Sequence, residues 1–266
     1  MKNVYFFILF SLLGIFNSCS ETQVKNEPIE ASRTAIFFND FIPSYLYEVP
    51  NLEIEQVEYF NHVIGNYRID AHVDSINAKV VYLKITDPKE NIVYQGRTLN
   101  GKKDGWWEVL QNKTLICCGN YISNKKYGFW RYYKLEGETK KFVNFKNDTL
   151  DGLAQEYSKD SILISEGNYV KGLKLNYWKY FHNNGKVKEQ GYFHDGCKSG
   201  WWQSFESNGN LLEEASYSRN EISGYVKKYL KGILFEEGKL FNGRRRGTWK
   251  SYNEKGKLES IHEYEE

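Results

Sequence analysis

Histidine and cysteine are the residues of this 266-residue chain most able to form a metal site. No histidine shows the His-x-His or His-Glu-x-x-His spacing of metal sites and metalloproteases. The spacing of Cys117, Cys118 and Cys197 also fails every zinc-binding pattern. We therefore predict neither a metal nor another cofactor. The five histidines are His62, His72, His182, His194 and His262.

Acidic pairs such as Glu213-Glu214 and Glu236-Glu237 are the other groups with catalytic chemistry. Such pairs are also the normal decoration of exposed strands, and the chain has no nucleophile elbow, phosphate loop or dinucleotide fingerprint. We expect a protein that is not an enzyme, with a hydrolase as the last alternative. The formal net charge of +2 gives no reason to expect a nucleic acid partner.

Exposed aromatic and basic side chains are the candidate binding groups. Aromatic residues make up 17% of the chain, and flat aromatic rings on a sheet stack well on sugars. Basic residues near predicted turns suit lipid phosphates or an acidic partner. Charged turns that keep sheet edges soluble explain the same residues. The candidate binding surface comprises Trp106, Tyr192, Trp201, Arg244, Arg245 and Arg246.

A repeat with steps of 23 or 24 residues positions these side chains. It is clearest from Gly191 to Glu214, and clear copies begin at Gly96. A fixed period of this length indicates a repeat array. One column of the repeat contains Trp107, Trp130, Ala154, Trp178, Trp202, Val226 and Trp249.

Two turn signals in each repeat predict how the strands pair. If Gly196 opens a two-residue hairpin loop, Gly191 faces Trp202. The second turn, at Asn184-Gly185, brings Trp178 opposite the same glycine. We therefore expect the rings of Trp178 and Trp202 to lie over the bare backbone of Gly191. Leucine at position 191 should then cost about 1–3 kcal/mol and alanine clearly less.

The same register places aromatic residues over a second glycine column. Phe193 would face Gly200, and both ladders would lie on one side of the sheet. A type I′ turn centred on Asp195-Gly196 is the alternative register. It would place Gly191 opposite Gly200 and leave the tryptophans unexplained, so the first register is preferred.

The repeat pattern G-x-[YF]-x-x-G-x-x-x-G-x-W-x-x-[YF]-x-x-x-G, as in Gly191 to Gly209, resembles the MORN-repeat superfamily. It is most similar to the bacterial variant labelled antitoxin-like. The resemblance implies an all-β fold: a single-layer, twisted antiparallel meander of repeated β-hairpins. It also implies a role in interaction or scaffolding and no catalytic residues.

The N-terminus has the features of an export signal, with Lys2 followed by a short apolar run. Ser18-Cys19 resembles the lipobox at which bacterial lipoproteins are cleaved and lipidated. We predict a signal peptide over 1–18, a flexible tether over 19–34 anchored through Cys19, and an irregular cap over 35–78. The repeat array then covers 79–266.

These features together predict a lipoprotein of the bacterial cell envelope. It would lie in the outer membrane and face the periplasm or the surface. Its ribbon would act as a protein-interaction scaffold for an unidentified protein. A glycan-binding module that uses exposed aromatic residues is the alternative.

Overall fold

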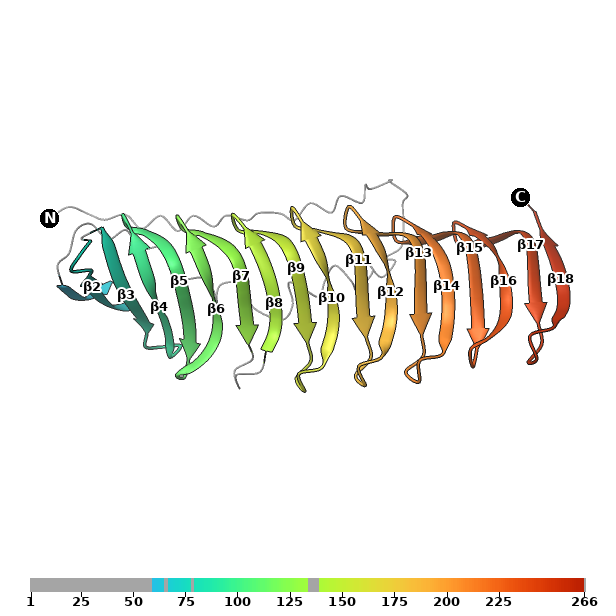
Figure 1. Ribbon diagram of the computed structural model, residues 1–266, viewed down its shortest axis with the longest axis horizontal. Coiled ribbons are helices and arrows are strands. Elements are labelled where there is room, and N and C mark those ends of the chain that lie inside the picture. Colours follow the sequence, from blue (N-terminus) through green and yellow to red (C-terminus); the bar gives the residue numbers. More distant parts are fainter. Residues whose placement is uncertain (1–58, 65–66, 78, 134–138, 266) are drawn as a thin grey trace.

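The computed structural model describes residues 59–64, 67–77, 79–133 and 139–265. They form one elongated antiparallel sheet of 18 strands, in which the hairpins follow one another along the long axis (Figure 1). The strands are β1 (Tyr59–Ile64), β2 (Tyr67–Val73), β3 (Val80–Asp87), β4 (Ile92–Leu99), β5 (Lys102–Gln111), β6 (Thr114–Ile122), β7 (Lys125–Tyr133), β8 (Thr139–Lys146), β9 (Thr149–Tyr157), β10 (Leu163–Val170), β11 (Leu173–Phe181), β12 (Val187–His194), β13 (Cys197–Phe205), β14 (Leu211–Ser218), β15 (Glu221–Leu230), β16 (Ile233–Phe241), β17 (Arg244–Tyr252) and β18 (Leu258–Tyr264).

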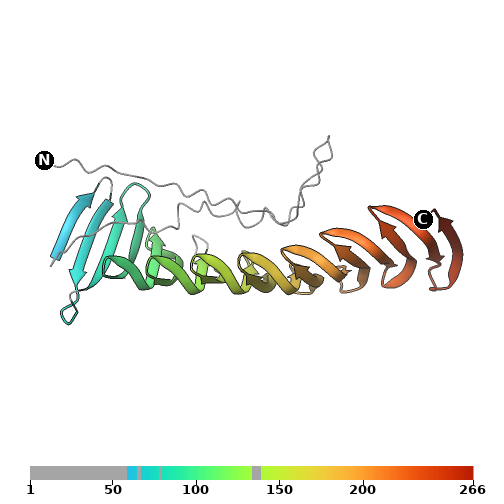
Figure 2. The ribbon, with the colours of Figure 1, turned by 90° about the horizontal axis from the view of Figure 1, so that it is seen from above.

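Each of these strands pairs with its neighbours in sequence, so the predicted all-β meander is confirmed. The described part of the chain contains no helix. Seen from above, the strands are bowed rather than flat (Figure 2). The predicted signal peptide, the tether and residues 35–58 of the predicted cap lie outside the described residues.

The first turn of each repeat is a type I′ turn, which corrects the preferred loop position. In the β12–β13 hairpin, Asp195 and Gly196 have φ angles of 49° and 78°, and His194 pairs with Cys197. Positive φ at both central residues defines this turn type, whose twist matches that of a two-stranded ribbon. The loop therefore comprises 195–196, as in the alternative register.

A β-bulge nevertheless restores the predicted pairing of Gly191 with Trp202. Tyr192 pairs with Ser199, whereas the adjacent Gly191 pairs with Trp202, so β13 holds two additional residues at this point. The first of these, Gly200, has a φ of +71°. Left-handed backbone of this kind favours glycine or asparagine. The column at this position is Gly105, Gly128, Gly152, Asn176, Gly200, Gly224 and Gly247, all with positive φ.

The predicted contact between Phe193 and Gly200 is therefore wrong. Phe193 pairs with Lys198 on β13, and Gly200 faces Tyr217 on the following strand, β14. A Cβ atom at Gly200 would meet nothing within 4 Å, so no ring covers this glycine. Its backbone conformation, rather than lack of space, explains the residue type.

Gly191 has the opposite reason for being glycine. The indole ring of Trp202 occupies the space that a Cβ atom at Gly191 would need. The ring is fixed by its Nε1, which donates to the backbone carbonyl of Tyr192 at 2.9 Å. Trp178 on β11 also pairs with Gly191, but the ring of Trp178 covers Gly167 on the other side. Only one of the two predicted rings therefore lies over Gly191. The other glycines covered in this way are Gly96, Gly119, Gly167 and Gly238.

The tryptophan face of the sheet is the face that carries Trp107, Trp130, Trp178, Trp202 and Trp249, which are all buried. Aromatic side chains of the next strand pack edge-on between these indoles. Phe193, for example, lies 6.0 Å from Trp178 and 5.1 Å from Trp202, measured between ring centroids. Such T-shaped pairs place the positive ring edge on the negative ring face.

Basic side chains cover the indoles on the same face. The Nζ of Lys174 lies 4.4 Å from the ring centre of Trp178, and that of Lys198 lies 4.2 Å from Trp202. The guanidinium of Arg245 stands 4.2 Å above Trp249. These cations interact with the negative faces of the rings. Several basic residues near the turns therefore pack on the buried rings, and do not serve only as solvated charges at the sheet edge.

Two hairpins lack the tryptophan, the glycine that it covers and the cation above it. Ala154 and Val226 replace tryptophan, and Val143 and Ala215 replace the glycines opposite them. At the cation position the same hairpins carry Leu150 and Ile222. The buried core is continuous from Ile69 to Trp202. Ala215, Val226 and Trp249 form a second cluster, and the partly buried Tyr217 packs against both.

Candidate outer-face binding site

The outer face is the side of the sheet opposite the tryptophan face. It carries one exposed apolar side chain in each bulge from β5 to β15, and the bulge of β17 has Thr248 at this position. Bulges re-aim the side chains of the extra residues. Here the residue after the left-handed position projects outward, directly before the buried tryptophan position. These residues, called the apolar row below, are Trp106 (42% exposed), Phe129 (36%), Leu153 (45%), Tyr177 (37%), Trp201 (41%) and Tyr225 (54%).

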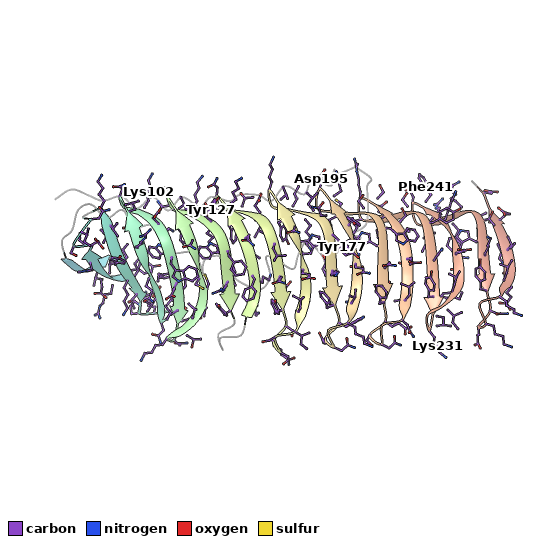
Figure 3. All side chains as sticks on the ribbon, viewed as in Figure 1. Lys102, Tyr127, Tyr177, Asp195, Lys231 and Phe241 are labelled. Carbon is purple, nitrogen blue, oxygen red and sulfur yellow. The ribbon has the colours of Figure 1, made fainter. Side chains whose placement is uncertain are left out.

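The apolar row runs along the ribbon and not at its edges. Tyr177 lies near the middle of the ribbon's width, whereas Asp195 and Lys231 lie at opposite long edges (Figure 3). Successive members sit on every second strand, from β5 to β15. At about 4.8 Å between strands, the spacing along the row is about 10 Å.

A polar row runs beside it, made of residues that pair directly across consecutive strands. Amides and carboxylates within this row bond to one another. Gln190 donates to Gln203 at 2.9 Å, and Gln203 donates to Glu214 at 2.9 Å. The polar row contains Asp70, Lys84, Gln95, Glu108, Arg131, Gln155, Glu166, Lys179, Gln190, Gln203, Glu214, Lys227, Glu237 and Lys250, and it is interrupted by Cys118 and Phe142.

The two rows are joined by hydrogen bonds from indole to carboxylate. Trp106 Nε1 donates to Glu108 Oε1 at 3.0 Å, which fixes the direction of an exposed ring. At Glu214, burial raises the pKa, but hydrogen bonds from Tyr229, Gln203 and Trp201 outweigh it and hold the pKa below its ordinary value. Glu214 therefore stays an ionised acceptor that orients Trp201.

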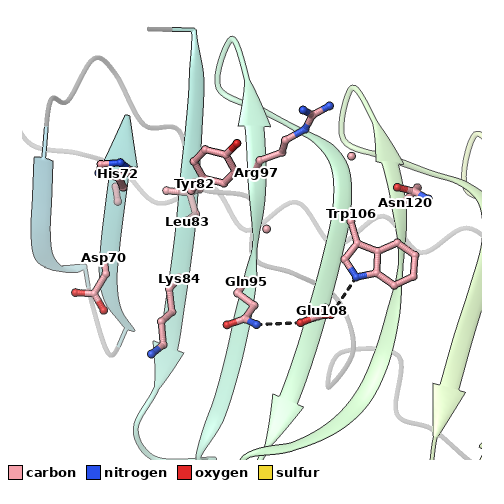
Figure 4. Close-up of a pocket in the computed structure, with 13 residues that line it drawn as sticks. Asp70, His72, Tyr82, Leu83, Lys84, Gln95, Arg97, Trp106, Glu108 and Asn120 are labelled. Carbon is pink, nitrogen blue, oxygen red and sulfur yellow. Dashed lines mark hydrogen bonds between the residues drawn. The ribbon is translucent and has the colours of Figure 1, made fainter. Parts of the chain in front are cut away.

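A hollow of about 820 Å³ lies at the N-terminal end of the outer face (Figure 4). Trp106 and Glu108 line one side, and Tyr82 and Lys84 line the other. Gln95 donates to Glu108 at 2.9 Å between them. Because Glu108 accepts from both Gln95 and Trp106, it acts here as a hydrogen-bonding group held by its neighbours. The hollow presents aromatic surface together with amide and charged groups.

The three aromatic residues among the six predicted binding residues lie together on the outer face. Trp106 and Trp201 belong to the apolar row. Tyr192 is 56% exposed and contacts Tyr177, with 5.0 Å between the ring centroids. Tyr177, Tyr192 and Trp201 thus place three exposed rings on consecutive strands, β11 to β13.

The three arginines do not form one patch with these rings. Arg245 covers Trp249 on the tryptophan face and forms a 2.6 Å ion pair with Glu236. Arg246 donates to the backbone carbonyl of Glu265 at 3.4 Å. Arg244 is exposed beside the turn. The alternation of side chains along β17 separates these residues, so their proximity in sequence was misleading.

Sequence reasoning missed four members of the row: Phe129, Leu153, Tyr177 and Tyr225. The signal was the column directly before the tryptophan column, which is large and apolar in every hairpin from β5 to β15. Asn176 was a second signal. It occupies the glycine column that contains Gly200, and asparagine indicates left-handed backbone rather than a need for a small side chain.

Reactive and metal-binding groups are sparse on both faces. Cys117 and Cys118 are free and buried, and burial raises the pKa of the Cys117 thiol to about 12. In the ranges that the structure describes, no three His, Cys, Asp or Glu side chains gather as metal ligands. Those ranges also contain no helix with the length and apolarity needed to span a bilayer.

Comparison with known families agrees with the repeat geometry. Two segments match the MORN repeat variant. They are residues 175–195, which contain most of β11 and all of β12, and residues 245–266, which contain most of β17 and all of β18. Each match covers one strand with a buried tryptophan and the strand that follows it. A search of curated proteins finds no match.

Proposed function

We propose that this chain is a non-enzymatic binding scaffold of a bacterial envelope that presents its outer face to an extended partner. The observation that supports the proposal most is the apolar row. It places one exposed apolar side chain on every second strand from β5 to β15, on a sheet whose tryptophan face is occupied by its own packing. Exposed aromatic side chains in line are otherwise unexpected on a protein surface.

The sheet suits this task because its shape is fixed locally. The bulge and the type I′ turn recur along the array and five hairpins bury an indole at the same position. Hydrogen bonds also join adjacent turns. The backbone N–H of Lys198, for example, donates to the side chain of Asn220 at 2.6 Å, and Asn220 N–H donates to the carbonyl of Lys198 at 3.1 Å. A preorganised surface loses little entropy when it binds.

A lipid on Cys19 would hold this scaffold at a membrane. The short apolar run ending at Ser18-Cys19 and the polar stretch after it motivate this part of the proposal. Replacement of Cys19 by Ser should release the protein from the membrane fraction and remove the lipid mass. Unchanged membrane retention and mass in the Cys19→Ser variant would contradict the anchor.

Site-specific photo-cross-linking in the producing bacterium tests the use of the outer face. A photoreactive residue at Tyr177 or Tyr225 should give discrete adducts. The same residue at Lys255, in the exposed turn before β18, is the matched control and should give none. Adducts at Lys255 alone, or at no position, would contradict the outer face as the binding surface.

A further inference from the structure

We infer that the outer face binds an extended β-1,4-linked chain of hexose sugars lying along the apolar row. This inference rests on the proposed function and names the chemistry of its partner. The apolar row, the polar row beside it and the hollow at its end carry the argument.

The period of the row matches such a chain. Adjacent members of the apolar row are two strands apart, which corresponds to about 10 Å. This is close to the length of one disaccharide in an extended β-1,4-linked chain. Successive sugars in that chain are turned by about half a revolution, so every second ring presents the same face. Each member of the apolar row, aromatic at every position except Leu153, therefore meets an equivalent sugar.

The chemistry beside the row also suits sugars. A hexose ring presents C–H groups on its faces, which stack on aromatic rings, and hydroxyl groups around its rim. The polar row offers amides and carboxylates along one side, including Gln95, Gln190 and Gln203. Asn120 and Asn168 lie on strands between members of the apolar row and are exposed. These groups both donate and accept, as hydroxyl groups require.

Other polymers fit less well. Acidic residues such as Glu108 and Glu214 lie beside Trp106 and Trp201, which opposes a polyanionic nucleic acid. A protein interface needs a contiguous apolar centre, whereas Asn or Ser residues separate many members of this row. Strand addition by a peptide needs an open sheet edge, and β2 to β17 pair on both sides.

The hollow gives the row a recessed end. Trp106 is both the first member of the apolar row and part of the hollow wall. Tyr82, which is 47% exposed, and Arg97 stand on the strands before it. A sugar stacked on Trp106 would thus have polar groups on two further strands within its reach. We expect this end and the Tyr177–Tyr192–Trp201 group to contribute most to affinity.

Calorimetric titration of the full-length chain carrying Cys19→Ser tests the inference. Cellohexaose and chitohexaose are the β-1,4-linked probes, and maltohexaose, whose α-1,4 linkage curves the chain, is the matched control. At least one β-linked hexamer should bind at least about tenfold more tightly than maltohexaose. Its disaccharide should also bind about tenfold or more weakly, because it meets one ring only.

Substitutions in the apolar row test whether the β-linked hexamer binds there. Tyr177→Ala combined with Trp201→Ala should weaken the β-linked hexamer about tenfold or more, since two stacking contacts are lost. Phe241→Ala is the control, because Phe241 is 53% exposed but lies at the long edge (Figure 3). Circular dichroism melting should show that both variants remain folded.

The outcomes separate the inference from the proposed function. Equal binding of α- and β-linked hexamers, no binding of either, or full affinity in the double variant would overturn the inference. If the hexamers fail while Tyr177 still cross-links to a protein, the scaffold stands and its partner is a protein. If the cross-links fail as well, both proposals fall.

Discussion

The indole ring of Trp202 lies flat against the backbone of Gly191 and fills the space where a Cβ atom would stand. The same relationship occurs in five hairpins, each time with the indole nitrogen bonded to the carbonyl of the residue after the glycine. Val143 and Ala215 occupy this column only where the partner on the following strand, whose side chain would cover the position, is not tryptophan. They therefore give no evidence that a side chain at Gly191 would be tolerated.

Gly191→Ala should destabilise the protein by about 1–3 kcal/mol, the usual cost of overpacking. The expectation of a mild effect from alanine needs correction, because the first atom of the side chain already overlaps a rigid ring. Urea unfolding followed by circular dichroism measures the change. Ala215→Gly is the comparison in a hairpin without tryptophan, where no ring lies over the backbone. A loss below about 0.5 kcal/mol in Gly191→Ala would contradict the overlap.

Trp202→Val should relieve part of the damage caused by Gly191→Ala. The double variant reproduces the natural pair of Ala215 with Val226. Its loss of stability should be smaller than the sum of the two single losses by about 0.5–3 kcal/mol. A double-mutant cycle of unfolding free energies provides the test, and strict additivity would show that the two positions do not compete for the same space.

Gly200 should accept asparagine far better than valine. Its φ of +71° is left-handed, and Asn176 occupies the equivalent position with a φ of 62°. We expect Gly200→Val to cost about 1–2 kcal/mol more than Gly200→Asn, because a β-branched residue is strained in this conformation. Thermal unfolding of the two variants compares them. Equal stability would mean that the backbone at the bulge is not held in this conformation.

Lys174 should make stability rise with pH above about 8. Burial lowers its pKa from 10.5 to about 8, although Glu156 and Glu189 act in the opposite direction. Between pH 8 and 10.5 the unfolded chain binds the additional proton, so deprotonation favours the folded state. The gain is at most about 3 kcal/mol.

Comparison with Lys174→Met isolates this effect from other titrating groups. The difference in unfolding free energy between the native chain and this variant should shift in favour of the native chain from pH 8 to pH 10. Lys171→Met, at an exposed turn residue, should show no such shift. A difference independent of pH would contradict the buried position of the ammonium.

Cys117 should resist alkylation in the folded protein. Its thiol is buried, and a pKa of about 12 leaves almost no thiolate at pH 8. Mass spectrometry of the peptide that covers β6 should detect no iodoacetamide adduct at Cys117 until urea is added. Rapid modification without urea would show that β6 opens readily.

The sequence was sufficient to predict the sheet, the hairpin period and the pairing of Trp202 with Gly191. It was not sufficient for the turn-side half of each hairpin. Glycine can be required because a ring covers the backbone, as at Gly191, or because the backbone is left-handed, as at Gly200. The residue type alone does not distinguish these two reasons. The predicted loop was placed one residue too late, and the two additional residues of the bulge were not predicted. These two errors cancel beyond the bulge, so the pairing of Gly191 with Trp202 was correct although the turn was not.

The candidate site was predicted in part, for a related reason. Trp106, Tyr192 and Trp201 were selected as aromatic residues and do lie on one face. Arg244, Arg245 and Arg246 were selected as a charge cluster, and strand alternation divides them between faces. The lysines over the buried indoles were not predicted. Whether the ammonium group of Lys198 reaches the ring of Trp202 depends on the backbone geometry of the bulge between them, which the sequence does not reveal.

The contact between β14 and β15, where Ala215 pairs with Val226, lacks the indole that most other hairpins bury at this position. Each strand pairs only with the strands next to it in sequence, so each part of the ribbon is stabilised by its immediate neighbours alone. Where Ala215 meets Val226, neither an indole nor a cation couples the two sides. We therefore expect the amide hydrogens of the strands from β15 to β18 to exchange with solvent without unfolding of the strands before them, which hydrogen exchange followed by mass spectrometry would measure.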